Sequence, residues 1–179
     1  METILIVDSD QNFISHLAGN LLPSMGYDIV VAYDGQQAVG LLRDNWKYLD
    51  LMLLNLELPD LSGLDILRQL TDEGHSVPTI LTTSDNSGHI VIDAFRLGVQ
   101  DYLLKPINED QLRSSISRAL DNARLRRTTE RLTTQLKEQI NWLTVLSRVG
   151  KSITSTLDID SVLKRMERRA EKTKDSGSK

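Results

Sequence analysis

The sequence predicts an α/β fold: a five-stranded parallel sheet, doubly wound as (βα)5, with a long C-terminal α-helical extension. Three observations predict it. Short apolar runs alternate with segments of helical periodicity over the first 120 residues. The runs are almost continuously apolar, as in parallel strands that are covered on both faces. Residues 110–149 contain neither proline nor glycine and are rich in helix-forming residues.

The strands and helices alternate in a regular order. The expected strands are Ile4–Val7, Ile29–Ala32, Leu51–Leu54, Thr79–Thr83 and Tyr102–Leu104. Amphipathic helices are expected between them, because apolar residues recur three or four positions apart. Their stripes are Phe13, Leu17 and Leu21; Ala38, Leu41 and Leu42; Leu64, Leu67 and Leu70; and Ile90, Ala94 and Leu97. Right-handed crossovers then give one open sheet with helices on both faces.

Polar side chains follow several of these strands at their carboxyl ends, where functional groups collect in open parallel sheets. Asp8-Ser9-Asp10 follows the first strand, and Asn55 follows the third. Thr83 ends the fourth strand, and Lys105-Pro106 follows the fifth. We therefore expect these residues to lie together at one edge of the sheet.

A fifth helix is predicted to begin near Asn108, which can cap it. Beyond residue 123 a heptad seam is visible on this helix. It consists of Leu125, Thr129, Leu132, Leu136, Gln139, Leu143 and Leu146. The spacing favours a parallel dimeric coiled coil, so that a homodimer through residues 124–149 is expected. The alternative is a helix that folds back onto its own domain.

Gly150 is expected to end the long helix. A polar connector follows, and Asp158 or Asp160 would cap a short final helix that runs through Met166. The last dozen residues are charged or small and are expected to fray. The expected organisation is therefore a domain over 1–122, a coiled-coil helix over 123–149, and a connector with a short helix and tail over 150–179.

Charge separates these parts. Residues 1–120 contain 7 Lys and Arg against 17 Asp and Glu, a net charge of −10; residues 121–179 contain 14 against 8, a net charge of +6. An acidic body argues against nucleic-acid binding except through the tail.

The chain has no cysteine, which excludes disulfides and thiolate metal sites. The apolar run after Met1 is too short for a signal peptide or a membrane span, so a cytoplasmic protein without a membrane partner is expected.

The order and spacing of several motifs resemble the receiver domain of two-component response regulators, over residues 2 to about 122. The segment ILIVD ending at Asp8 resembles the first strand and its acid, and LMLLNLELPDLSG, with Asn55, resembles the third strand and acceptor loop. The segment PTILTT, which ends at Thr83, resembles the fourth strand with its switch hydroxyl. The segment AFRLGVQDYLLKP resembles the part of the family that ends in a lysine and a proline; the lysine here is Lys105. The resemblance also implies a cis bond between Lys105 and Pro106.

The resemblance implies phosphoryl transfer from a histidine kinase to an aspartate, beside a magnesium ion held by carboxylates. A lysine and a hydroxyl bind the phosphoryl oxygens. Here Asn55 stands at the acceptor position, and its neutral amide is a poor nucleophile toward phosphorus. Ser9 stands where the family has a second metal-binding acid. The phosphorylation-site pocket would therefore consist of Asp8, Ser9, Asn55, Thr83 and Lys105, without a working acceptor and with no catalytic residue.

Metal binding is expected to be weakened, with Asp8 and, through its side chain, Glu57 as the remaining candidate ligands for Mg²⁺. Thr83 and Tyr102 match the family's switch residues, although strand-end packing would also explain both. Lys105 would equally serve as the partner that neutralises a buried Asp8. An engineered origin of Asn55 is an alternative to natural degeneration. The basic cluster Arg124, Arg126, Arg127 and Arg131 is interpreted as a solvated coiled-coil face.

The segment from Ile140 to Leu163 resembles the signalling helix that leads into a GAF domain. The primary hypothesis is thus a non-enzymatic pseudo-receiver. It would act in phosphorelay signalling through protein contacts, near Ile90–Leu97 and Tyr102–Arg113, and through dimerisation. The partners would be a histidine kinase or another signalling protein. The alternatives are a working phosphoacceptor that uses Asp10, Glu57 or Asp60, and a transcriptional regulator that binds DNA through its basic tail.

Overall fold

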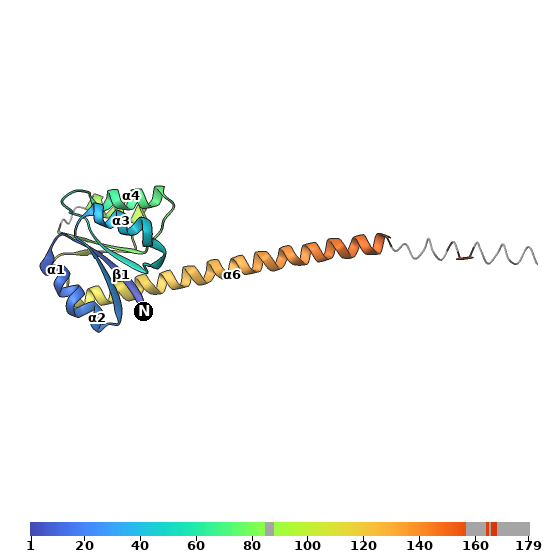
Figure 1. Cartoon of the computed structure of the whole chain (residues 1–179), viewed down its shortest axis with the longest axis horizontal. Coiled ribbons are helices and arrows are strands. Elements are labelled where there is room, and N and C mark those ends of the chain that lie inside the picture. Colours follow the sequence, from blue (N-terminus) through green and yellow to red (C-terminus); the bar gives the residue numbers. More distant parts are fainter. Residues whose placement is uncertain (85–87, 157–163, 165, 168–179) are drawn as a thin grey trace, which may run out of the picture. The chain divides into compact units, whose positions relative to one another are not determined.

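The computed structural model describes residues 1–84, 88–156, 164, 166 and 167. The chain divides into two compact units, Met1–Arg127 and Thr128–Lys179. The first unit contains a five-stranded parallel sheet with helices on both faces (Figure 1). The predicted fold class is therefore confirmed, including the long helix that follows the sheet.

The sheet has the strand order β2-β1-β3-β4-β5, and all neighbouring strands are parallel. The strands are β1 (Glu2–Val7), β2 (Tyr27–Ala32), β3 (Leu51–Asn55), β4 (Thr79–Thr83) and β5 (Asp101–Leu104). The central strands β3 and β4 are buried at every position, whereas the edge strands β2 and β5 are only partly buried. Continuous apolar runs thus mark the strands covered on both faces.

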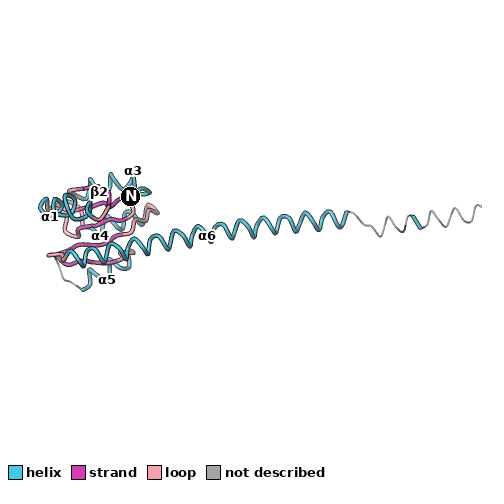
Figure 2. The backbone as a smooth tube through the Cα atoms, turned by 90° about the horizontal axis from the view of Figure 1, so that it is seen from below, coloured by secondary structure: helices cyan, strands magenta, loops and turns pink. Residues whose placement is uncertain are grey.

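The helices follow the strands in the expected alternation. Figure 2 colours the helices cyan and the strands magenta. They are α1 (Gln11–His16), α2 (Leu22–Ser24), α3 (Gly35–Asn45), α4 (Gly63–Asp72), α5 (Gly88–Arg96) and α6 (Glu109–Thr156). A π-helical segment, Leu17–Leu21, joins α1 to α2, and a short 3-10 turn, Trp46–Tyr48, follows α3. The single helix expected around Phe13 and Leu21 is therefore interrupted by a wider turn.

Two hydrophobic clusters cover the two faces of the sheet. Along β1, Leu5 and Val7 face the cluster that contains α3, α4 and α5, while Ile4 and Ile6 face the cluster with α1, α2 and the first turns of α6. Successive side chains of a strand point to opposite faces, so one apolar run supplies both clusters. In Figure 1, α3 and α4 lie on the opposite side of the sheet from α1 and α2.

Polar caps begin the helices at the edge that carries the candidate site. Asp10 caps α1 and Ser62 caps α4. Asn108 caps α6 as predicted, because its side chain accepts hydrogen bonds from the backbone N–H groups of Asp110 and Gln111. The bond between Lys105 and Pro106 is cis, as the resemblance implied.

Helix α6 does not end at Gly150, so the expected end of the helix is wrong: the helix continues to Thr156. A glycine inside a helix costs only about 1 kcal/mol relative to alanine, and the flanking helix-forming residues outweigh that cost. The expected capping residues Asp158 and Asp160 lie outside the described residues. Among the positions that are described further on, Lys164, Met166 and Glu167 are helical.

The first part of α6 packs against the sheet through a buried stripe. Leu112, Ile116, Ala119, Leu120 and Ala123 form it. None of these residues belongs to the heptad seam, and Leu125, where the seam begins, is 66% exposed. The buried stripe therefore ends before the predicted seam begins.

Two arginines of the basic cluster hold α6 against the sheet. Arg124 lies 2.8 Å from Glu2, and Arg127 lies 2.9 Å from Asp50, whose carboxylate also accepts a hydrogen bond from the N–H of Thr3. Because of Glu2, the pKa of Arg124 is raised. The interpretation of the cluster as a solvated coiled-coil face stays a prediction. Arg124 and Arg127 are exposed, and each of them also pairs with an acid of the first unit.

A search of the described helices for a segment that is both long and apolar enough to cross a membrane finds none.

Candidate functional site

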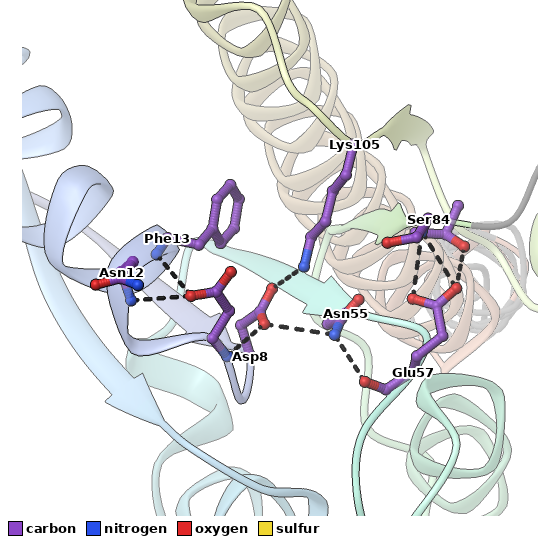
Figure 3. A network of polar contacts seen from close by, with 9 residues as sticks. Asp8, Asn12, Phe13, Asn55, Glu57, Ser84 and Lys105 are labelled. Atoms are coloured by element: carbon purple, nitrogen blue, oxygen red, sulfur yellow. Dashed lines mark hydrogen bonds and ion pairs between the residues drawn. The ribbon is translucent and has the colours of Figure 1, made fainter.

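The parallel register brings the predicted site residues to one edge of the sheet. Asn55 pairs with Thr82, and Thr83 pairs with Leu104, so that the ends of β3, β4 and β5 lie level. Val7 pairs with Leu54 in the same way. Asp8, Asn55, Thr83 and Lys105 therefore stand at the ends of four strands and meet at the carboxyl edge. Figure 3 shows Asp8, Asn55 and Lys105 there.

Asp8 forms the centre of the site. Its side chain is 1% exposed, and its Oδ2 lies 2.6 Å from Nζ of Lys105. The same Nζ lies 4.7 Å from the centre of the Phe13 ring, a cation–π contact that keeps the ammonium over α1. A buried carboxylate needs a charged partner, and Lys105 supplies it.

Asn55 is oriented by the acceptors around it. Its Nδ2 donates to the backbone oxygen of Glu57 at 2.7 Å and to Oδ1 of Asp8 at 3.4 Å. Turning the amide over would place its oxygen against two acceptors, so the hydrogen bonds fix the orientation. Oδ1 of Asn55 is buried without a hydrogen-bond partner in the described structure. The nucleophilic carboxylate of a phosphoacceptor is thus replaced by an amide that donates toward Asp8.

Asp10 links Asp8 at the end of β1 to the start of α1 through hydrogen bonds. The N–H of Asp10 donates to Oδ1 of Asp8 at 2.9 Å, while the carboxylate of Asp10 accepts from the N–H groups of Asn12 and Phe13 at the start of α1. Ser9 is exposed. The capping role of Asp10 turns its carboxylate toward the start of α1.

The carboxylate of Glu57 lies on the opposite side of Asn55 from Asp8. It accepts the hydroxyl hydrogen of Thr83 at 2.5 Å and the N–H of Ser84 at 3.2 and 3.4 Å. Figure 3 shows this carboxylate directed at Ser84, while only the backbone oxygen of Glu57 contacts Asn55. Sequence reasoning did not include Ser84, because a backbone N–H donor leaves no signal in residue type.

Tyr102 is partly buried and packs against the cluster around α3, α4 and α5.

Gly63 allows the loop after Asn55 to pack back against the end of β3, where α4 begins. Its N–H donates to the backbone oxygen of Leu56 at 3.0 Å. A Cβ at this position would lie 2.7 Å from the backbone oxygen of Asn55, so only glycine allows α4 to begin so close to the end of β3.

The donor set does not fit a divalent cation. Among the described residues no group of three or more Asp, Glu, His or Cys side chains converges on one point. The oxygens of Asp8 face three nitrogen donors, from Lys105, Asn55 and Asp10. Magnesium prefers hard oxygen ligands in octahedral geometry, whereas here nitrogen donors face the acid and the Glu57 carboxylate is directed to β4.

Asp60 lies in the same loop and joins it to α3. Its two carboxylate oxygens accept from the N–H groups of Gly35 and Gln36, each at 2.8 Å. The hydrogen bond from Gly35 is the largest cause of a lowered pKa for Asp60. The acid is therefore a second cap of α3, beside Asp34.

A five-stranded doubly wound domain with a buried acid and a lysine at its carboxyl edge defines a receiver-type signalling module. Residues 4–117 match the family described as response regulator receiver domain. The chain is 38% identical over 112 residues to the transcriptional regulatory protein CpxR of Escherichia coli (strain K12), which covers 63% of this chain and 46% of that protein. It is 33% identical over 124 residues to the transcriptional regulatory protein ZraR of Klebsiella oxytoca, covering 68% of this chain and 27% of the relative.

Among solved structures, the signal receiver domain of a LuxO repressor protein from Vibrio parahaemolyticus superposes with a TM-score of 0.65 at 27% identity. The match covers 72% of this chain and 97% of that one. The chain belongs to the response regulator receiver domain family. It spans about half the length, or less, of these curated relatives.

Proposed function

We propose that this protein is a pseudo-receiver of two-component signalling, which is not phosphorylated on residue 55 and works through protein contacts instead of an enzymatic activity. The observation that carries the proposal is the Asn55 amide: it donates a hydrogen bond toward Asp8 where an acceptor needs an anionic oxygen. Lys105 is paired with Asp8, so the main cation of the site already has an anionic partner inside the chain.

The contacts would be made with a histidine kinase or another signalling protein, and with a second copy of this chain. From Arg124 to Val149 the side chains of α6 are exposed, and the leucines of the seam are among them. A long helix with an exposed apolar seam gains most of its stability from a partner helix. A parallel coiled coil of two copies would bury the seam and pass a signal along α6. The segment from Ile140 to Leu163 resembles the signalling helix that leads into a GAF domain. The cytoplasmic location stays a prediction.

The first alternative is a phosphoacceptor that uses another acid. In the structure the carboxylates of Asp10 and Asp60 cap α1 and α3, and that of Glu57 accepts from Thr83 and Ser84. Phosphorylation of any of them would break hydrogen bonds that hold the loops, which favours the pseudo-receiver.

The second alternative is a DNA-binding regulator. The similar proteins CpxR and ZraR are transcriptional regulatory proteins by name, and the basic charge of this chain lies after residue 120. The affinity of the basic tail for DNA should fall steeply as the salt concentration rises, because contacts with DNA phosphates release counterions. A fluorescence polarisation titration with a labelled duplex at low salt tests this, and lack of binding there removes the alternative.

Incubation with acetyl phosphate and magnesium, followed by intact-mass measurement, tests the main proposal. We expect no stoichiometric gain of a phosphoryl group, whereas a receiver with an acceptor aspartate serves as the positive control. A full gain of one phosphoryl group by the unaltered chain would defeat the proposal. Peptide mapping would then identify the acid.

A further inference from the structure

Two hydrogen-bond donors converge at the end of β4. They are the hydroxyl of Thr83 and the backbone N–H of Ser84, neighbours in the chain that both point to the carboxylate of Glu57 (Figure 3). A hydroxyl and a main-chain N–H aimed at one point make a binding site for an anionic oxygen, and charge-assisted bonds of this kind are short and strong. The 2.5 Å separation of Thr83 Oγ1 and Glu57 Oε1 is of that kind.

The anionic oxygen cannot come from residue 55. The Asn55 side chain carries no charge, and its Nδ2 is turned to Asp8 and to the backbone of Glu57. A phosphoryl group on a residue at this place would present anionic oxygens to its surroundings, and these are strong acceptors. Glu57 stands two residues farther along the chain, and its carboxylate presents the same kind of oxygen to the donors.

We infer that Glu57 is a built-in anionic acceptor, which takes within the chain the hydrogen bonds of Thr83 and Ser84 that a phosphoryl group on residue 55 would otherwise receive. This inference rests on the proposed function. It adds that the end of β4 is held to the loop after β3 at all times, and not only after a modification. Each charged or donor group of the site then has a partner within the chain: Lys105 pairs with Asp8, and Glu57 accepts from Thr83 and Ser84.

Amide hydrogen exchange followed by NMR tests the inference on the whole chain. In Glu57→Ala we expect the Ser84 N–H to exchange at least about tenfold faster than in the unaltered protein, the effect of one lost hydrogen bond to a charged group. Glu57→Gln keeps the shape and one acceptor oxygen without the charge, so its exchange should be intermediate. The control is Asp72→Asn, which removes an exposed carboxylate from α4 and should leave Ser84 unchanged.

The Glu57 side chain belongs to an exposed residue, so both variants should fold, and thermal unfolding verifies this. Should Glu57→Ala fail to fold, Glu57→Gln alone decides. Unchanged exchange of Ser84 in the folded variants overturns the inference. That result leaves the pseudo-receiver proposal intact, because the acetyl phosphate experiment on the unaltered chain tests the proposal separately.

A second readout uses an acceptor restored by substitution. In the double variant S9D/N55D, a phosphoryl group on residue 55 would compete with Glu57 for the donors of Thr83 and Ser84. Adding Glu57→Gln should raise the extent of phosphorylation by acetyl phosphate about fivefold, in line with the weight of one hydrogen bond. Equal extents, or a lower extent after the added substitution, would show that Glu57 does not occupy the place of the anion.

Discussion

Nζ of Lys105 lies 2.6 Å from Oδ2 of Asp8, although 97 residues separate the two in the chain. The pair joins the end of β5 to the end of β1. The Asp8 side chain is 1% exposed, so the contact is a buried link across the carboxyl edge of the sheet. If Asn55 accepts no phosphoryl group, as proposed, we expect the role of the pair to be structural.

A double-mutant cycle should show that structural role. Lys105→Met leaves Asp8 buried without its cation and should lower the free energy of unfolding by about 3 kcal/mol. Asp8→Asn combined with Lys105→Met removes both charges and should recover most of that loss. Urea denaturation measures all four proteins. If the double variant is less stable than the sum of the single changes predicts, the two residues do not form a stabilising pair.

Magnesium should not stabilise the unaltered protein, because nitrogen donors face Asp8. The melting temperature in millimolar MgCl₂ should equal that in NaCl of matched ionic strength. The variant S9D/N55D places two more carboxylates beside Asp8 and should become more stable with magnesium, by about 1.4 kcal/mol when the ion is tenfold above its dissociation constant. A clear shift for the unaltered chain would contradict the account of the site.

The contribution of Asp60 should depend on pH. The hydrogen bonds from Gly35 and Gln36 hold the pKa of this carboxyl below its ordinary value. A carboxyl with a lowered pKa in the folded state stabilises the fold above its unfolded pKa, and the effect is lost as the pH falls through the folded pKa. The stability difference between the unaltered protein and Asp60→Asn should therefore be largest near neutral pH and shrink below the ordinary Asp pKa of about 4. Urea denaturation over this pH range measures it, and a difference that grows toward acid would refute it.

Dimerisation should depend on the heptad seam. Light scattering should give twice the chain mass of 20.2 kDa at tens of micromolar. Replacing Leu136 and Leu143 by Glu puts charges into the seam and should yield a monomer. The matched control is Gln135→Glu, one position off the seam. A monomeric unaltered protein would rule out the coiled coil.

The ion pairs at the start of α6 should contribute modestly. Arg124→Gln and Arg127→Gln remove the contacts with Glu2 and Asp50, and each should lower the melting temperature only slightly, since both arginines are largely exposed. Arg126→Gln, on the same turn, is the control and should be neutral. Thermal unfolding at low and high salt should show the difference shrinking as salt is added. A salt-independent loss would mean that packing of the arginine stems is responsible.

The order of strands and helices followed from local patterns. Runs such as Leu51–Leu54 and Thr79–Thr83 indicated buried strands, and Asn108 indicated the start of α6, because periodicity and capping depend on neighbours within a few residues. The same locality explains the error at Gly150, where a helix that is favourable on both sides continues through one unfavourable residue. The π-helical turn at Leu17–Leu21, which contains the buried Leu17 and Leu21, had no local signal either.

The sequence by itself determined which residues reach the carboxyl edge, because parallel strands end at a common edge and the strand ends can be found from the apolar runs. It also determined that residue 55 carries no carboxylate. Only the tertiary structure decided what these residues do there: the amide of Asn55 turns toward Asp8, Glu57 bonds to Thr83 and Ser84, and Arg124 reaches Glu2. Such contacts join residues that are distant in the chain, and their partners are selected by packing and by the need of each buried polar group for a hydrogen bond.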